Sequence, residues 1–217
     1  MDIAKKIAEE LEIKVTQVEA AVKLIDEGNT IPFISRYRKE ATGTLNDEQL
    51  RNLNERLTYL RNLEDKKNQV LSSIEDQGKL TEELKAQILA AQTLVVVEDL
   101  YRPYRPKRRT RATIAKEKGL EPLANIIMLQ MTGKSIEEEA EAFVSEEKEV
   151  ASVADAIAGA KDIIAEHISD EADYRIHIRD LTAKKGTISS TAKDPEAQSV
   201  YEMYYEFEEP VKKLAGH

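Results

Sequence analysis

Apolar residues recur at helical spacing along most of the chain. The longest such stripe covers residues 50–74, where leucine, valine and isoleucine repeat every three or four positions. Asn46 stands before the stripe and Gly78 after it, and these residue types commonly begin and end helices. We therefore predict a long central helix over about residues 46–77, on which shorter helices pack. A coiled-coil dimer is the alternative, but Lys67 interrupts its apolar seam.

Two shorter apolar stripes fill residues 1–27 and predict an N-terminal hairpin of two helices that resembles a helix-turn-helix. The exposed face of the second helix would be net acidic, with Gln17, Glu19, Lys23, Asp26 and Glu27. Because acidic side chains are repelled by DNA phosphates, we interpret this pair as a structural hairpin rather than a DNA-reading element.

The remaining apolar stripes also predict helices. Three valines within residues 93–100 favour a strand locally, but no strand partner is evident nearby, so we predict a buried helix there. A helix over residues 171–184 is expected to bury Ile176 and Leu181, and a final helix is expected from Pro195 through Tyr205. Residue types that cap helix starts precede several of these segments, at Thr81, Thr110, Ser135 and Ser152.

Composition agrees with an all-α, multi-helix fold. Only 8 glycines and 6 prolines occur in 217 residues, and good helix formers dominate. Possible subdomain seams lie near residues 30–44 and 101–110. The absence of cysteine suits a reducing compartment, the acidic start is unlike a secretion signal, and no apolar run is long enough to span a membrane. We therefore expect a cytoplasmic protein without membrane contact.

Local charge reverses between residues 101 and 118, a segment that we call the basic strap. It has eight basic residues against one acid, a net charge of +7 in a chain of net charge −9. Two prolines fix backbone torsions and remove amide donors, so Arg102–Arg109 is expected to be extended. Arginines interleaved with tyrosines are typical of surfaces that hold phosphates and stack bases. The candidate nucleic-acid-binding residues are Arg102, Tyr104, Arg105, Lys107, Arg108, Arg109 and Arg111.

Two other charged segments affect this interpretation. Arg36, Arg38 and Lys39 form a secondary basic cluster, and residues 137–149 hold seven glutamates against one lysine. Outside the strap the chain sums to −16, so the strap is alternatively an internal latch paired with acidic helices. In that case the acidic helices would dock a basic protein partner.

The sequence offers no catalytic constellation. Residues 132–135 mimic the end of a phosphate-binding loop, but Met128 stands where that loop needs glycine. His167 and His177 lack further ligands at metal-binding spacing, and no nucleophile, base and orienting group can be matched. We expect no enzymatic activity, no metal site and no cofactor.

Several long segments carry a family resemblance. They read TIPFISRYRKEATGTL, VVEDLYRPYRPKRRTRATIAKEKGLEPLA, GAKDIIAEHISDEADYR and YYEFEEPVKKLAGH. Together they resemble the N-terminal helical region of the Tex family of bacterial transcription accessory proteins. The resemblance implies a longer protein, with a resolvase-like domain and a C-terminal oligonucleotide-binding barrel that are absent from this chain, and a nucleic-acid-binding role without known catalysis.

Two hypotheses follow from the residues and the resemblance. The first is a non-enzymatic helical scaffold that contacts phosphate backbones of RNA or DNA through the basic strap. The alternative is a protein-interaction module that docks the transcription machinery, with the strap as its latch.

Overall fold

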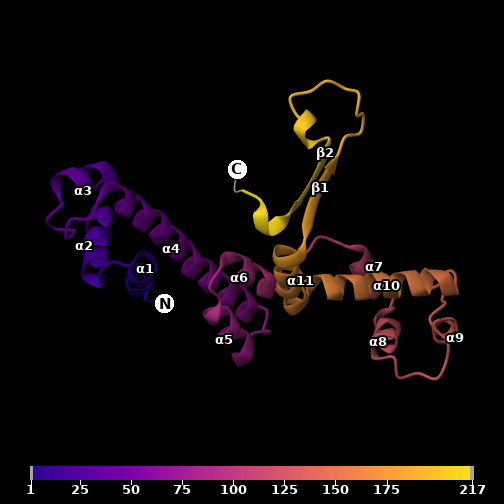
Figure 1. Ribbon diagram of the computed structural model, residues 1–217. Coiled ribbons are helices and arrows are strands. Elements are labelled where there is room, and N and C mark those ends of the chain that lie inside the picture. The colour runs from indigo at the N-terminus through magenta and orange to yellow at the C-terminus, as the bar shows by residue number, and fades with distance from the viewer. Residues whose placement is uncertain (1, 216–217) are drawn as a thin grey trace. The chain divides into compact units, whose positions relative to one another are not determined.

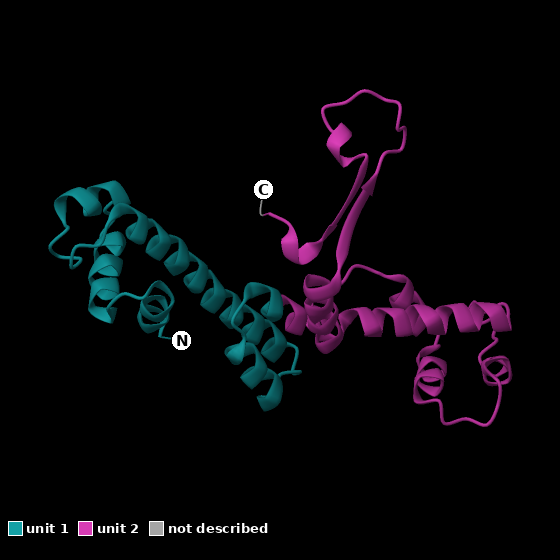
Figure 2. Cartoon of the chain, in the orientation of Figure 1, with its two compact units in different colours: residues 1–97 teal, residues 98–217 magenta. Residues whose placement is uncertain are grey.

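The computed structural model describes residues 2–215, which contain eleven α-helices and one two-stranded sheet (Figure 1). The predicted all-α class is confirmed, with this small sheet as an addition. The chain divides into two compact units, residues 1–97 and 98–217, and the division falls within helix α6 (Figure 2). Each unit is described by itself below. None of the helices in residues 2–215 has the length and apolar character needed to cross a membrane.

The first unit is built on one long helix. Its elements are α1 (Ile3–Leu11), α2 (Val15–Asp26), α3 (Ile31–Tyr37), α4 (Asp47–Asp76), α5 (Glu82–Ala90) and the start of α6 (Leu94–Tyr101). Asn46 caps α4 by accepting a hydrogen bond from the Gln49 amide at 2.8 Å, and Gly78 follows the helix with φ of 66°. The predicted central helix is therefore confirmed to within a residue at each end.

Lys67 does not break the apolar face of α4 but is buried in it. Its ammonium donates to the Leu89 carbonyl oxygen at 2.9 Å and pairs with Glu64 at 3.0 Å. Burial of a lysine is tolerated when its donors find such partners. The same face buries the leucines of α4 against α1, α2, α3 and α5.

The predicted N-terminal hairpin is confirmed as α1 and α2. Glu12 ends α1 in the left-handed region, with φ of 54°, where such hairpins commonly carry glycine. Arg61 of α4 holds α2 through two hydrogen bonds to Asp26, at 2.7 and 2.8 Å. These bonds lower the pKa of the Asp26 carboxyl and occupy part of the face that a DNA-reading helix would present.

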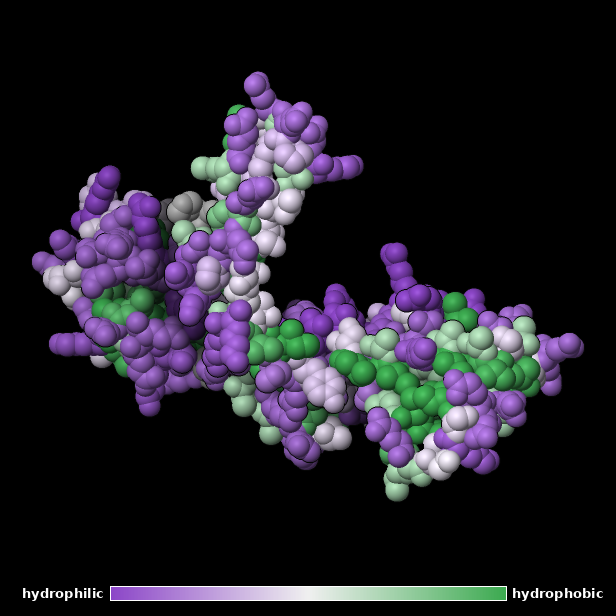
Figure 3. Space-filling model, turned by 45° about the vertical axis from the view of Figure 1, so that its right-hand side comes forward, coloured by the Kyte–Doolittle hydropathy of each residue, from purple (hydrophilic) through white to green (hydrophobic). Residues whose placement is uncertain are grey.

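The second unit is organised around α10. After the end of α6 come η1 (Arg102–Tyr104), α7 (Arg111–Glu117), α8 (Glu121–Leu129), α9 (Ile136–Glu141), α10 (Val153–Asp170), α11 (Ala172–Lys185), β1 (Thr187–Thr191), η2 (Glu202–Tyr204), β2 (Glu206–Pro210) and η3 (Val211–Lys213). Helices α7, α8 and α9 pack on α10 around small residues such as Ala156 and Ala160. Hydrophobic residues gather over this part of the unit (Figure 3).

Four of the cap residues predicted from sequence are confirmed. Thr81, Thr110, Ser135 and Ser152 each accept a backbone hydrogen bond at the start of α5, α7, α9 and α10. The predicted helix over residues 171–184 is present as α11, but none of the residues of α11 is buried. Leu181 is 45% exposed, so the prediction that Leu181 is buried is wrong.

The predicted final helix, Pro195 through Tyr205, is wrong. That segment is a loop with only one short 3₁₀ turn, η2, and it joins two antiparallel strands (Figure 1). Thr187 pairs with Pro210 at one end of the β-hairpin and Thr191 with Glu206 at the other. The pairing of β2 with the β-branched residues of β1 joins segments that are distant in the sequence. The local pattern at Pro195, which is typical of a helix start, carries no information about such a pairing.

Candidate nucleic-acid interface

The basic strap begins as a continuation of α6. Residues Arg102–Tyr104 form the 3₁₀ helix η1, and the Arg105 amide donates to the Tyr101 carbonyl at 3.0 Å. The prediction of an extended Arg102–Arg109 is therefore wrong for its first three residues. Proline is tolerated early in a helix because its missing donor is not needed there. From residue 105 to residue 110 the backbone is irregular, and Thr110 then caps α7.

Two strap cations pair with a carboxylate at the end of α10, although the Arg102 side chain remains 46% exposed. The Arg102 guanidinium donates to Asp170 Oδ1 at 3.0 Å, and Lys107 pairs with the other oxygen of Asp170. Lys107 also lies 3.5 Å from Glu166, which in turn accepts from the Thr110 hydroxyl. Asp170 is buried and lies at the negative end of the α10 dipole, where a carboxylate charge is unfavourable. The positive charges of Arg102 and Lys107 offset that unfavourable charge. These contacts form a latch between strap and helix.

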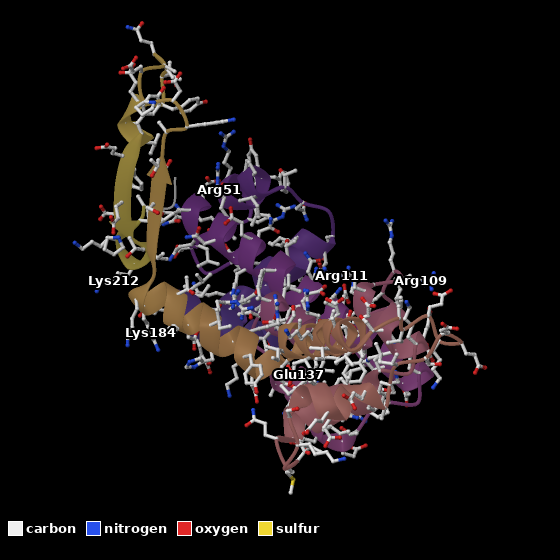
Figure 4. All side chains as sticks on the ribbon, turned by 90° about the vertical axis from the view of Figure 1, so that its right-hand side faces the viewer. Arg51, Arg109, Arg111, Glu137, Lys184 and Lys212 are labelled. Atoms are coloured by element: carbon white, nitrogen blue, oxygen red, sulfur yellow. The ribbon has the colours of Figure 1, made fainter. Side chains whose placement is uncertain are left out.

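Four other strap arginines are exposed. Arg105 is 64% exposed and reaches Glu98 only at 3.9 Å, while Arg109 is 67% exposed and pairs with Glu117 at 2.7 Å. Arg111 is 86% exposed and lies 3.6 Å from Asp162. Arg108 has no side-chain partner among residues 2–215. Arg109 and Arg111 lie on the same side of the second unit (Figure 4).

Tyr104 is half-buried rather than presented as an open stacking platform. It lines an open pocket of about 600 Å³ together with Lys107, Asn125 and His167. A second pocket, of about 520 Å³, lies behind the strap and is lined by comparable numbers of cations and carboxylates. Its mixed charge makes the pocket a poor anion site, so the exposed Arg108 and Arg109, which do not line it, are the better place for a phosphate.

Asp99 has a role that the sequence did not reveal. Its partners are Arg175, whose Nε lies 2.7 Å away, and Arg179, both on α11. Burial alone would raise the pKa of Asp99, but the hydrogen bonds from both arginines outweigh it and hold that pKa below its usual range. Asp99 therefore fastens α11 to the end of α6.

The secondary basic cluster lies at the end of α3, in the first unit. Arg36, Arg38 and Lys39 are exposed, and none of them makes an ion pair within the described part of the chain. The Arg38 guanidinium lies 5.3 Å from the centre of the Phe33 ring. Cluster and strap thus belong to different units.

Known proteins place the chain in a family. Residues 1–75 match the family described as Tex-like protein N-terminal domain, and residues 132–217 match the one described as Tex central region-like. "Uncharacterized protein YdcI" of Bacillus subtilis (strain 168) is 47% identical over 218 residues, covering 99% of this chain and 30% of the relative. "Transcriptional accessory protein Tex" of Neisseria gonorrhoeae is 41% identical over 220 residues, covering 100% of this chain and 28% of the relative.

A human relative is more distant. "S1 RNA-binding domain-containing protein 1" of Homo sapiens is 28% identical over 185 residues, covering 85% of this chain and 18% of the relative. The chain thus spans less than a third of the length of each of these relatives. The two family matches and the identity to a protein named Tex confirm the resemblance seen in the sequence, and the chain belongs to the Tex family.

Proposed function

We propose that the chain is a non-enzymatic helical scaffold of a cytoplasmic transcription accessory protein, and that its strap makes an auxiliary contact with the phosphate backbone of RNA or DNA. The observation that carries the proposal is the division of the strap cations into two that are held by Asp170 and four arginines that are largely exposed. Support for the class of function comes from the printed names of the relatives, one a transcriptional accessory protein and one named for an RNA-binding domain.

The exposed arginines suit a phosphate in three respects. Guanidinium groups donate two parallel hydrogen bonds to phosphate oxygens. Their present carboxylate partners are surface pairs, which contribute only about 0–1 kcal/mol and can be exchanged for a phosphate. The latch fixes the backbone behind them, so less freedom is lost when a strand binds. Such a contact positions a nucleic acid without reading its bases.

The non-enzymatic part of the proposal rests on the acids near the strap. Asp99, Glu166 and Asp170 each bind cations or a hydroxyl group of this chain. A carboxylate whose oxygens are occupied in this way is poorly placed to take a proton from a substrate.

The test is fluorescence anisotropy of labelled single-stranded RNA and DNA with this chain and a variant carrying Arg105→Glu, Arg108→Glu and Arg109→Glu. A matched control reverses three exposed lysines of the first unit at positions 5, 79 and 85. The strap variant should lose most of its affinity, and the salt slope should fall by about 2, at about 0.7 per phosphate contact. Equal affinity for the strap variant and the control would refute the contact.

A second candidate function is favoured by the latch. If the strap serves only to hold α10, then Arg102→Gln with Lys107→Gln will lower the unfolding temperature and leave nucleic-acid affinity unchanged. The acidic helices of the chain would then bind a basic protein of the transcription machinery. Parallel melting and anisotropy measurements on this double variant and on the triple variant separate the two functions.

A further inference from the structure

We propose that helices α8 and α9 and the loop between them form a docking surface for a basic amphipathic helix of a protein partner. This inference goes beyond the phosphate contact, because it involves neither the strap nor a nucleic acid. It rests on an exposed apolar patch, on the floor beneath that patch, and on the unpaired charges in the same stretch of chain.

The patch contains five large apolar side chains within a short stretch of chain. Met131 is 85% exposed and Leu129 is 65% exposed. Exposed apolar residues are common when scattered, but a cluster of them marks an interaction surface. The members of the patch are Met128, Leu129, Met131, Ile136 and Val144.

The floor of this surface is the edge of the core of the second unit. Ile127 of α8, Phe143 after α9, and Ile157 and Ile164 of α10 are partly buried and pack on the central cluster. Figure 3 shows the resulting hydrophobic band over α8 and α10, bordered by hydrophilic residues. A partner that covers the patch would therefore extend an existing core rather than create a separate contact.

The helices that carry the patch are held in place. Both lie on the same side of α10, and the loop joins them (Figure 1). Gln130 ends α8 in the left-handed region, with φ of 51°, and Ser135 and Glu138 form a reciprocal capping box at the start of α9. The methionines are the adaptable part, since their unbranched side chains adjust to different apolar partners.

Glutamates are dense in and after α9, in the same stretch of chain as the patch, and remain largely unpaired. Of the seven glutamates in residues 137–149, Glu149 makes an ion pair within residues 2–215, with Lys118 at 3.8 Å. No ion pair within the described residues engages Glu137, Glu141, Glu146 or Glu147, and Glu137 is labelled in Figure 4. Such an acidic stretch repels the phosphates of nucleic acids and of anionic lipids. An apolar strip with lysines or arginines beside it fits both features, and a basic amphipathic helix presents this arrangement.

The probe is a fluorescein-labelled peptide of about 18 residues, composed of leucine and lysine with the leucines at helical spacing. Its binding to the 217-residue chain is measured by anisotropy at about 50 mM and about 300 mM NaCl. Leu129→Ser with Met131→Ser should weaken binding at least about tenfold at both salt concentrations. The matched control, Val200→Ser with Met203→Ser, removes two exposed apolar side chains of the β-hairpin and should change binding less than about twofold.

Charge is tested separately from apolar contact. Glu137→Lys with Glu141→Lys should weaken binding about tenfold at low salt and less at high salt, whereas Glu55→Lys with Glu83→Lys should have little effect. The triple strap variant should bind the peptide normally, so a failure of the phosphate contact leaves this proposal intact.

Three results would overturn the proposal. The first is equal binding of a peptide with glutamate in place of lysine. The second is binding lost with the charge variant but kept with the serine variant, because that result indicates simple ion exchange. The third is a dimer in sedimentation that Leu129→Ser with Met131→Ser converts to monomer, which would assign the surface to a second copy of the chain.

Discussion

Replacing Asp99 by asparagine should loosen α11 while the rest of the second unit stays folded. The Asp99 side chain is 5% exposed and accepts hydrogen bonds from Arg175 and Arg179, both on α11. Because α11 buries none of its own residues, these bonds are a large share of what holds the helix. Asparagine keeps the shape and one acceptor oxygen, but it turns an amide donor toward one of the two guanidinium groups.

The size of the effect follows from the geometry. A hydrogen bond to a charged group contributes about 1.5–3 kcal/mol, and asparagine loses one such bond together with the charge. Both arginines are a third or more exposed and recover water when released, so the lower part of that range applies. A loss of about 2 kcal/mol in the free energy of opening corresponds to about thirtyfold faster local opening.

Hydrogen exchange measures this opening directly. Amides of residues 172–185 should exchange about thirtyfold faster in Asp99→Asn than in the unchanged chain, while those of α10 should change little. Asp180→Asn is the control, because Asp180 lies exposed on the same helix without a side-chain partner in the described residues. Equal protection of α11 in both variants would show that Asp99 does not fasten this helix.

Four further changes test other parts of the structure. In the wild-type chain, the protection of α11 against hydrogen exchange should persist while pH falls to about 4 and disappear below it. The reason is that Asp99 has a lowered pKa in the folded state, so its contribution to stability is lost as pH falls through that pKa. Hydrogen exchange measured over a series of pH values checks this, and Asp99→Asn should lack the transition. Gly159→Ala should lower stability to urea by about 1–2 kcal/mol, because the new methyl would lie 2.4 Å from a buried leucine carbon, whereas Gly133→Ala, with open space around it, should be neutral. Lys67→Ala should lower the free energy of unfolding by about 2–4 kcal/mol in the same assay, because it leaves a cavity and removes the hydrogen bond to the Leu89 carbonyl. Asp170→Asn should lower the melting temperature yet strengthen binding of single-stranded nucleic acid, because it releases Arg102 and Lys107.

Much of the helical framework could be predicted from sequence because its signals are local. Asn46 and Gly78 bound α4 within one residue of the predicted limits, and Thr110 and Ser135 cap the helices that follow them. Each of these residues acts on amides or carbonyls no more than one turn away. Local signals of this kind are the part of a fold that a single sequence predicts best.

The errors fall where partners are distant in sequence. Residues 187–191 are exposed throughout and lack the alternation of a half-buried strand, and their partner is the segment 206–210. The burial of Lys67 depends on a carbonyl of α5, 22 residues away. Asp99 binds arginines 76 and 80 residues further along the chain. No local pattern reports such pairings, so sequence predicted most of the helices but neither the β-hairpin nor these contacts.

In the basic strap, the net charge overestimates the number of cations that are available to bind phosphate. Its +7 suggested a single cationic surface, but Asp170, more than 60 residues further along the chain, engages Arg102 and Lys107. Four arginines remain exposed to a ligand. At about 0.7 per phosphate, four contacts to a single strand give a salt slope near 3, and release of Arg102 and Lys107 would raise it to about 4. The slope therefore counts the cations that reach phosphate. A salt slope near 3 indicates that the exposed arginines bind phosphate while Arg102 and Lys107 stay paired with Asp170. A salt slope near zero indicates that the strap holds α10 and does not bind phosphate.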